Sequence, residues 1–269
     1  MSERLPSAAT GLDHVAVVVA DLDAAEDAWR RLGFALTPRA VHADAAGVPT
    51  GTANATAMLR QGYVELLAVV DPARPSGTIA RFLGRGPGIH ILSLATGDEA
   101  AALERLRRAG FDTAIAETAR EGARFMRLPL AEADPRLQLI RHLTPELVWQ
   151  ERFLAHPNRA VALDAVVVVD DPPARFAARL SRAAGAALVP DPLGGYALDL
   201  PAGRVRVLPP DAMGAIFPGA PPAPWLPWIA GVVVRTDDGG AAVAGLGVAR
   251  AVAGGWLAEA AGAQVLFTA

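Results

Sequence analysis

Two histidines occupy matching places in a stretch of sequence that recurs along the chain. His14 opens the β-branched run Val15–Val19, and His90 stands at the corresponding point of Gly88–Asp98. An apolar run bounded by turn residues is typical of a buried strand, where a single histidine is usually a packing residue. A pair at matching positions instead indicates a shared binding site, because neutral imidazole is a common metal ligand. Packing of both rings in the core is the alternative.

Each histidine is followed at a similar spacing by an oxygen donor in a later predicted strand. Glu65 lies within the apolar stretch Tyr63–Val70, and Gln138 lies at the matching point of Arg136–Leu143. A carboxylate among apolar neighbours is costly unless it is ion-paired, protonated or bound to a metal. Glu65 is therefore expected to be paired, protonated or metal-bound, with a strand carboxylate facing solvent as the alternative. For Gln138 the alternative is an edge-strand glutamine without a role.

The elements that must position these residues form a unit that recurs four times. Each copy begins with a buried strand, continues into a helix and ends with further strands, and the period suits a small module of about four strands and one helix. The four copies begin near residues 11, 88, 163 and 228. In the third copy Ala165 takes the place of the histidine, and in the fourth Ala230 or Gly231 does. Two stretches rich in proline and glycine, 71–87 and 209–227, are predicted to be linkers.

Composition excludes several classes of function. The chain has 269 residues, is 52% hydrophobic and carries a net charge of −3, which argues against nucleic acid as a partner. There is no cysteine, so neither a disulfide framework nor a thiolate site can form. No run is long enough to span a membrane, and the polar first ten residues lack the core of a signal peptide. A soluble, cytoplasmic protein without membrane contact is expected.

The β-α-β-β-β plan, with a histidine opening the first strand and an acid or amide in the fourth, resembles the vicinal oxygen chelate superfamily. Asp13-His14, the Gly51–Asn54 stretch and Tyr63–Leu66 are similar to its glyoxalase-like branch. The resemblance covers nearly the whole chain. It implies an α+β fold of four tandem βαβββ modules paired into two open cradle domains, at residues 11–145 and 160–269. The second domain, having lost the ligands, is expected to serve packing, dimerisation or closure of the pocket.

In that superfamily one residue from each of four strands binds a divalent metal at the floor of a cradle. Carried over residue by residue, the resemblance implies His14, Glu65, His90 and Gln138 as ligands. Such a set suits Zn, Ni, Co, Mn or Fe. The glyoxalase I-like pattern contains two acids, whereas only one is present here. Glu65, the candidate catalytic residue, must therefore act as both ligand and base, unless the base comes from elsewhere. With one carboxylate ligand the divalent ion keeps a net positive charge, which favours an anionic small-molecule substrate.

Three functions follow from the resemblance. The first is a glyoxalase- or epimerase-type lyase or isomerase acting on a 2-oxo or 2-hydroxy acid, or a thioester-like substrate, through a metal-bound enediolate. The second is an iron-dependent extradiol-type dioxygenase using His14, His90 and Glu65. The third is a non-catalytic protein that binds a drug-like small molecule. A homodimer is compatible with each, and the substrate itself cannot be predicted. His142 and His156 are expected to be capping or turn residues, and His42 is left unassigned.

Overall fold

Eight strands of the first half close into a ring. The computed structural model describes residues 8–44, 46–74, 77–120, 122–130 and 134–269. Around the ring the order is β1-β4-β3-β2-β6-β7-β8-β5, and β5 also pairs with β1. The strands are β1 (Gly11–Val19), β2 (Ala40–Ala43), β3 (Pro49–Met58), β4 (Tyr63–Val69), β5 (Gly88–Ala95), β6 (Ala116–Arg120), β7 (Ala123–Pro129) and β8 (Arg136–His142). An open cradle was expected here. Among the described residues, the pair of Ala43 with Ala119 joins β2 to β6 and closes the ring.

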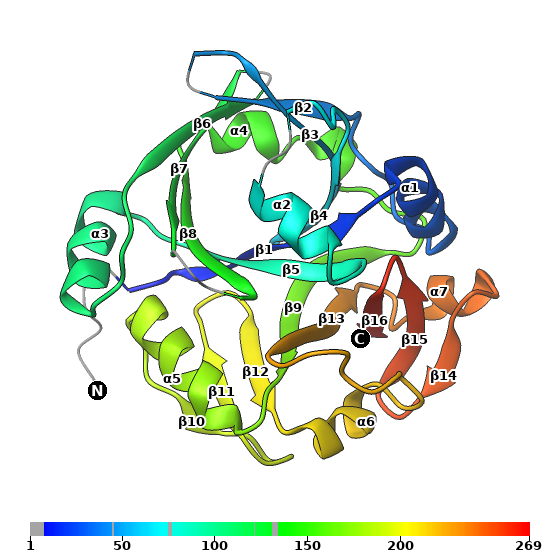
Figure 1. Cartoon of the computed structure of the whole chain (residues 1–269). Helices are drawn as coiled ribbons and strands as arrows, with labels where there is room; N and C mark the ends of the chain where they lie inside the picture. The colour runs from blue at the N-terminus through cyan, green and yellow to red at the C-terminus, as the bar shows by residue number, and fades with distance from the viewer. Residues whose placement is uncertain (1–7, 45, 75–76, 121, 131–133) are drawn as a thin grey trace.

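Besides the four-residue α4 (Pro145–Val148), which contacts β7, three helices accompany this ring (Figure 1). α1 (Leu22–Arg31) and α3 (Glu99–Arg108) lie outside it, and each begins at an aspartate whose carboxylate accepts backbone N–H bonds. α2 (Gly77–Leu83) lies within the ring in this view and buries Ile79 and Phe82. It falls in a stretch predicted to be a linker. A helix this short offers too few turns to show an apolar periodicity in the sequence.

The second half forms an open sheet in the order β14-β15-β16-β13-β9-β12-β11-β10. Its strands are β9 (Ala160–Val169), β10 (Val189–Pro190), β11 (Tyr196–Asp199), β12 (Arg204–Leu208), β13 (Trp228–Thr236), β14 (Arg250–Val252), β15 (Gly255–Ala260) and β16 (Ala263–Thr268). The remaining helical segments are α5 (Pro173–Ala184), α6 (Met213–Ile216), α7 (Ala241–Gly245) and the two 3-10 turns η1 (Glu151–Phe153) and η2 (Pro210–Ala212). η2 and α6 lie in the second stretch predicted to be a linker.

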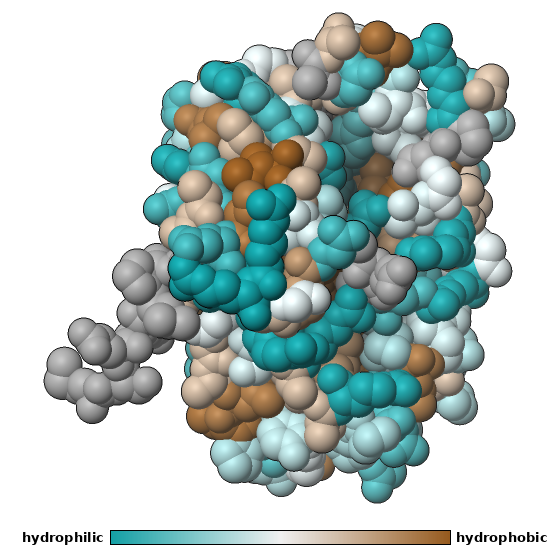
Figure 2. All heavy atoms as spheres, turned by 60° about the vertical axis from the view of Figure 1, so that its left-hand side comes forward, coloured by the Kyte–Doolittle hydropathy of each residue, from teal (hydrophilic) through white to brown (hydrophobic). Residues whose placement is uncertain are grey.

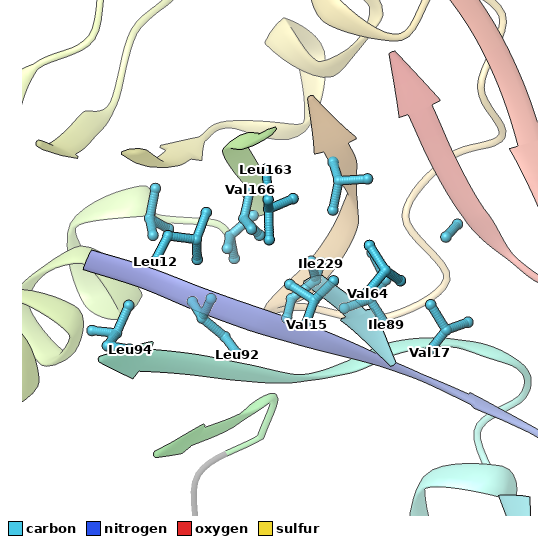
Figure 3. Close-up of a cluster of buried hydrophobic side chains, with 14 of the residues drawn as sticks. Leu12, Val15, Val17, Val64, Ile89, Leu92, Leu94, Leu163, Val166 and Ile229 are labelled. Atoms are coloured by element: carbon cyan, nitrogen blue, oxygen red, sulfur yellow. The ribbon is translucent and has the colours of Figure 1, made fainter. Parts of the chain in front are cut away.

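One hydrophobic core joins the two halves. Alternate residues of β1 face opposite sides, so Val15 and Val17 enter this core while His14 faces the inside of the ring. Figure 3 shows Val15 beside Val64 and Ile89 of the first half, with Val166 and Ile229 of the second close by. Residues of both halves thus exclude water from the same interior.

The predicted α+β class of fold, of the vicinal oxygen chelate type, is confirmed. In each quarter of the chain the first strand pairs in parallel with the last: β1 with β4, β5 with β8, β9 with β12 and β13 with β16. The division into domains at 11–145 and 160–269 stays a prediction. Within the described part of the chain, no helix is both long and apolar enough to cross a membrane.

Candidate functional site

The inside of the ring is a cavity of about 440 Å³. Side chains of a strand alternate between its two faces, so every second residue of a ring strand points inward. On β4 the inward residues are Tyr63, Glu65 and Leu67, and on β8 they are Arg136, Gln138 and Ile140. His14 of β1 and His42 of β2 line the same cavity. Figure 2 shows the outside of one face as a mosaic of hydrophilic and hydrophobic side chains.

A buried aspartate holds His14 in one orientation. The two side chains are nine-tenths or more buried, and His14 Nδ1 lies 2.6 Å from Asp13 Oδ1. Burial alone would raise the pKa of Asp13, but hydrogen bonds from His14 and His142 outweigh it and lower the pKa to about 2. Because an ionised carboxylate only accepts hydrogen bonds, Nδ1 of His14 carries the proton. The His14 ring also stacks on Tyr63, with centroids 4.4 Å apart.

A buried serine links His14 to Gln138. Ser93 Oγ lies 2.8 Å from His14 Nε2, and the amide nitrogen of Gln138 donates to the same oxygen at 2.7 Å. Since Ser93 accepts from the amide, its own proton is directed at His14 Nε2. The carbonyl oxygen of the Gln138 side chain is buried without a hydrogen-bond partner among the described residues. A chain of hydrogen bonds thus joins β1, β5 and β8.

The Glu65 carboxylate lies between two imidazoles. Its Oε2 is 3.9 Å from His14 Nε2, and its Oε1 is 3.5 Å from His42 Nε2. Asn54 donates a hydrogen bond to Oε1, and His42 Nδ1 lies 3.0 Å from Thr52 Oγ1. Glu65 is therefore a partly buried carboxylate inside the cavity, surrounded by polar partners, rather than a strand residue facing bulk solvent.

His90 lies outside this cavity. Ala16 pairs with Ile91 and Val17 with Ile89, so His90 is the extra residue of a bulge in β5. Its Nε2 contacts the carbonyl oxygen of Gly86 at 2.9 Å. The His90 ring stacks on Phe82 and Trp225, at centroid distances of 4.9 and 5.5 Å. Burial, the largest influence, lowers the pKa of His90.

The pairing also corrects the alignment of the repeats. Asp13 is the extra residue of a matching bulge in β1, between the pairs Leu12–Leu94 and His14–Ser93. The counterpart of Asp13 is therefore His90, and that of His14 is Ile91. Of the four predicted ligands, the structure brings together His14, Glu65 and Gln138 and leaves His90 elsewhere.

Two histidines at the site were not predicted. His42, unassigned from the sequence, faces Glu65, while His142 donates to Asp13 at 3.1 Å. His142 lies four residues after Gln138 in β8. Because side chains of a strand alternate between two faces, this even spacing could have predicted from the sequence that both lie on one face. His156 has the expected structural role, because it accepts from the Ala35 amide and contacts the Met58 carbonyl oxygen.

The residues fit a metal ion in part. Across the described ranges there is no group of three or more His, Cys, Asp or Glu side chains placed to hold one. The three predicted ligands in the cavity supply an imidazole nitrogen, a carboxylate and the unpartnered amide oxygen of Gln138. These donor types suit a first-row divalent ion. To bind a metal, His14 Nε2 would have to give up its hydrogen bond with Ser93. With His14, Glu65 and Gln138, such a site would have three protein ligands.

Comparison with known proteins agrees with this architecture. The model of the glyoxalase-like domain family matches residues 12–184. No curated protein matches the sequence. A hypothetical protein from Staphylococcus aureus superposes with a TM-score of 0.67 at 12% identity, covering 96% of this chain and 98% of that one.

Two solved enzyme structures are also similar. A triple mutant of 4-hydroxymandelate synthase from Streptomyces coelicolor has a TM-score of 0.59 at 17% identity, covering 90% of this chain and 76% of that one. Methylmalonyl-CoA epimerase from Mycobacterium tuberculosis matches 52% of this chain and 92% of its own, at 27% identity and a TM-score of 0.39. The similarity to 4-hydroxymandelate synthase supports the fold alone. With more than half of its residues matched by the family model, the chain belongs to the glyoxalase-like domain family of the vicinal oxygen chelate superfamily.

Proposed function

We propose that the ring cavity catalyses proton transfer at a carbon next to a carbonyl group, in a small substrate with oxygens on adjacent carbons. The observation that carries this proposal is the Glu65 carboxylate, which faces the cavity between His14 and His42. A carboxylate held in a partly dry cavity is a good base for a carbon acid. The protein would then be a lyase or isomerase of the glyoxalase or epimerase type.

The residues around Glu65 have distinct tasks in this mechanism. Glu65 takes the proton from the carbon, and the electron pair of the broken C–H bond moves into the carbonyl to give an enediolate. Positive charge from Arg127, which also lines the cavity, stabilises the negative charge that develops on the oxygens. Asn54 orients the carboxylate, and Asp13 keeps the His14 ring fixed beside it. The proton then returns from Glu65 to the same or the neighbouring carbon.

A metal would be held by His14, Glu65 and Gln138, and the candidates stay Zn, Ni, Co, Mn or Fe. When bound, a divalent ion supplies Lewis-acid polarisation of the two substrate oxygens. For protein purified without chelators, elemental analysis should find about one divalent ion per chain in the wild type and in His90→Ala. His14→Ala should retain at least about tenfold less, since it loses an imidazole ligand. Equal metal content in the wild type and His14→Ala would contradict this ligand set.

The two other functions have less support. The dioxygenase prediction depended on His14, His90 and Glu65, and His90 lies on another face of its strand. A passive binding protein gains nothing from a carboxylate placed in its cavity between two imidazoles, because desolvating that charge is costly. The geometry of Glu65 therefore favours proton transfer.

Deuterium exchange tests the proposed base. Hydroxypyruvate and dihydroxyacetone each carry an acidic C–H group between a hydroxyl and a carbonyl, so NMR in D₂O follows their exchange. We expect the wild type to catalyse exchange in hydroxypyruvate, and Glu65→Gln to lower the rate by about 10²–10⁴-fold. Glu104→Gln is the matched control, because that carboxylate pairs with Arg108 on the surface of α3. Exchange at the wild-type rate in Glu65→Gln would refute the assignment.

A further inference from the structure

Two arginines face the cavity from neighbouring strands. Arg127 of β7 and Arg136 of β8 line it together with Gln138. Around the ring, β3, β2 and β6 lie between β4 and β7 on one side, and β1, β5 and β8 lie between them on the other. Arg127 therefore stands across the cavity from Glu65, and a molecule in the ring can contact both walls.

Neither inward arginine has an acidic partner within the described ranges of the chain, whereas the outward arginines of the same strands do. Arg124 of β7 pairs with Glu117 at 2.6 Å, and Arg141 of β8 pairs with Glu99 at 2.5 Å. Arg127 instead donates to Thr118 Oγ1 at 2.8 Å. Arg136 lies over the Phe82 ring, 5.7 Å from its centroid. Among the described residues, no ion pair neutralises these two positive charges on the inner wall.

Holding these charges inside the ring costs free energy. Burial lowers the pKa of Arg127, although Glu65 acts in the opposite direction. Arg136 is half-buried, and the like charges of Arg127 and Arg81 act on it. Two like charges that repel each other in a partly desolvated wall lower the stability of the fold. Two apolar side chains at these positions would make the protein without ligand more stable. Stability lost in this way is typical of a functional site, and here the two positive charges suit the binding of an anion.

We propose that Arg127 and Arg136 bind the carboxylate of the substrate, which makes the substrate a small 2-oxo or 2-hydroxy carboxylate with its reacting carbon toward Glu65. This inference rests on the proposed function. Planar guanidinium groups bind carboxylates through paired N–H bonds, so the two forks can satisfy both carboxylate oxygens. A phosphate dianion would need further donors, and the residues that line this wall add a threonine hydroxyl and an amide rather than a nest of backbone N–H groups.

Binding measurements separate this inference from the chemistry. Hydroxypyruvate and 2-oxobutyrate are the carboxylate probes, dihydroxyacetone is the uncharged comparator, and inorganic phosphate is the competing anion. By calorimetry we expect both carboxylates to bind the wild type. Arg127→Gln and Arg136→Gln should each weaken binding by about tenfold or more. Arg141→Gln is the matched control on β8 and should bind like the wild type, since its side chain pairs with Glu99 on the outer face.

Two further measurements distinguish failure of this inference from failure of the proposed function. Glu65→Gln should bind the carboxylates at least as tightly as the wild type, because it removes a negative charge from the cavity. Carboxylate binding that depends on Arg136, without any proton exchange, would overturn the proposed function and leave this site intact. In anion-free buffer Arg136→Gln should melt at or above the wild-type temperature, whereas a structural arginine would lower it. Equal carboxylate affinity in Arg136→Gln, preference for phosphate or dihydroxyacetone, or no carboxylate binding would overturn the inference.

Discussion

At the scale of single residues, the site depends on a buried acid that stays ionised. Asp13 receives hydrogen bonds from His14 and His142, and these keep its charge where burial would remove it. The same bonds fix the His14 ring beside Glu65. The hydrogen bonds to Asp13 therefore both orient the His14 ring and contribute to the stability of the fold.

Asp13→Asn tests this link through its pH dependence. The pKa of Asp13 is about 2 in the fold, below its ordinary value of 3.8, so its ionised form adds stability above pH 3.8. That contribution, roughly 2 kcal/mol, is lost as the pH falls through about 2. In urea unfolding, Asp13→Asn should be less stable than the wild type by about this amount at pH 7. The difference should shrink between pH 4 and pH 2, and a difference independent of pH would contradict the assignment.

The sequence predicted part of the site at this scale. Repeat matching put Glu65 and Gln138 at corresponding points of two strands, and the strand pairing agrees, since Glu65 pairs with Ala16 and Gln138 with Ser93. His90 was matched to His14 because both open similar stretches, yet the bulge in β5 makes it the counterpart of Asp13. A bulge shifts the register of strand pairing by one residue. It cannot be recognised from the composition of the strand or from the spacing of its residues.

At the scale of elements, the second half keeps the strand plan but fills its concave side. The side chains of Met213 and Phe217, in and after α6, pack there against Trp228 of β13 and Leu266 of β16. Arg206, which stands where Glu65 does in the first half, makes two 2.7 Å bonds to Asp191. Apolar packing and an ion pair thus occupy the space that forms a cavity in the ring.

Gly231 shows why the last quarter of the chain cannot carry a side chain at the position that His14 holds in the first quarter. It is the counterpart of His14 by strand pairing, and a Cβ atom there would lie 2.2 Å from the backbone oxygen of Gln264. Gly231→Ala should therefore destabilise the fold by about 1–3 kcal/mol, through overpacking. The control is Gly214→Ala in α6, where a Cβ meets no atom within 4 Å. Chemical denaturation of both variants measures the difference, and equal stabilities would refute the steric explanation.

At the scale of the whole molecule, the two halves share one core while the candidate chemistry lies in one of them. Leu163 and Val166 of β9 belong to the same buried cluster as Leu12 and Val15 of β1. The α+β fold was predictable because buried strands and capped helices leave strong local patterns. Closure of the ring was not, since it depends on the pairing of β2 with β6, two short strands far apart in the sequence. The predictions of a homodimer and a cytoplasmic location stay predictions.

The central claim is that the ring cavity, and not the face that carries His90, performs the chemistry. The rate of deuterium exchange in hydroxypyruvate, compared between His14→Ala and His90→Ala, tests it most directly. His14 lies beside Glu65, so His14→Ala should lower the rate by about 10²-fold or more. His90 packs between Phe82 and Trp225, so His90→Ala should lose stability but keep the rate within about threefold of the wild type. Loss of exchange in His90→Ala, with the wild-type rate in His14→Ala, would contradict the account.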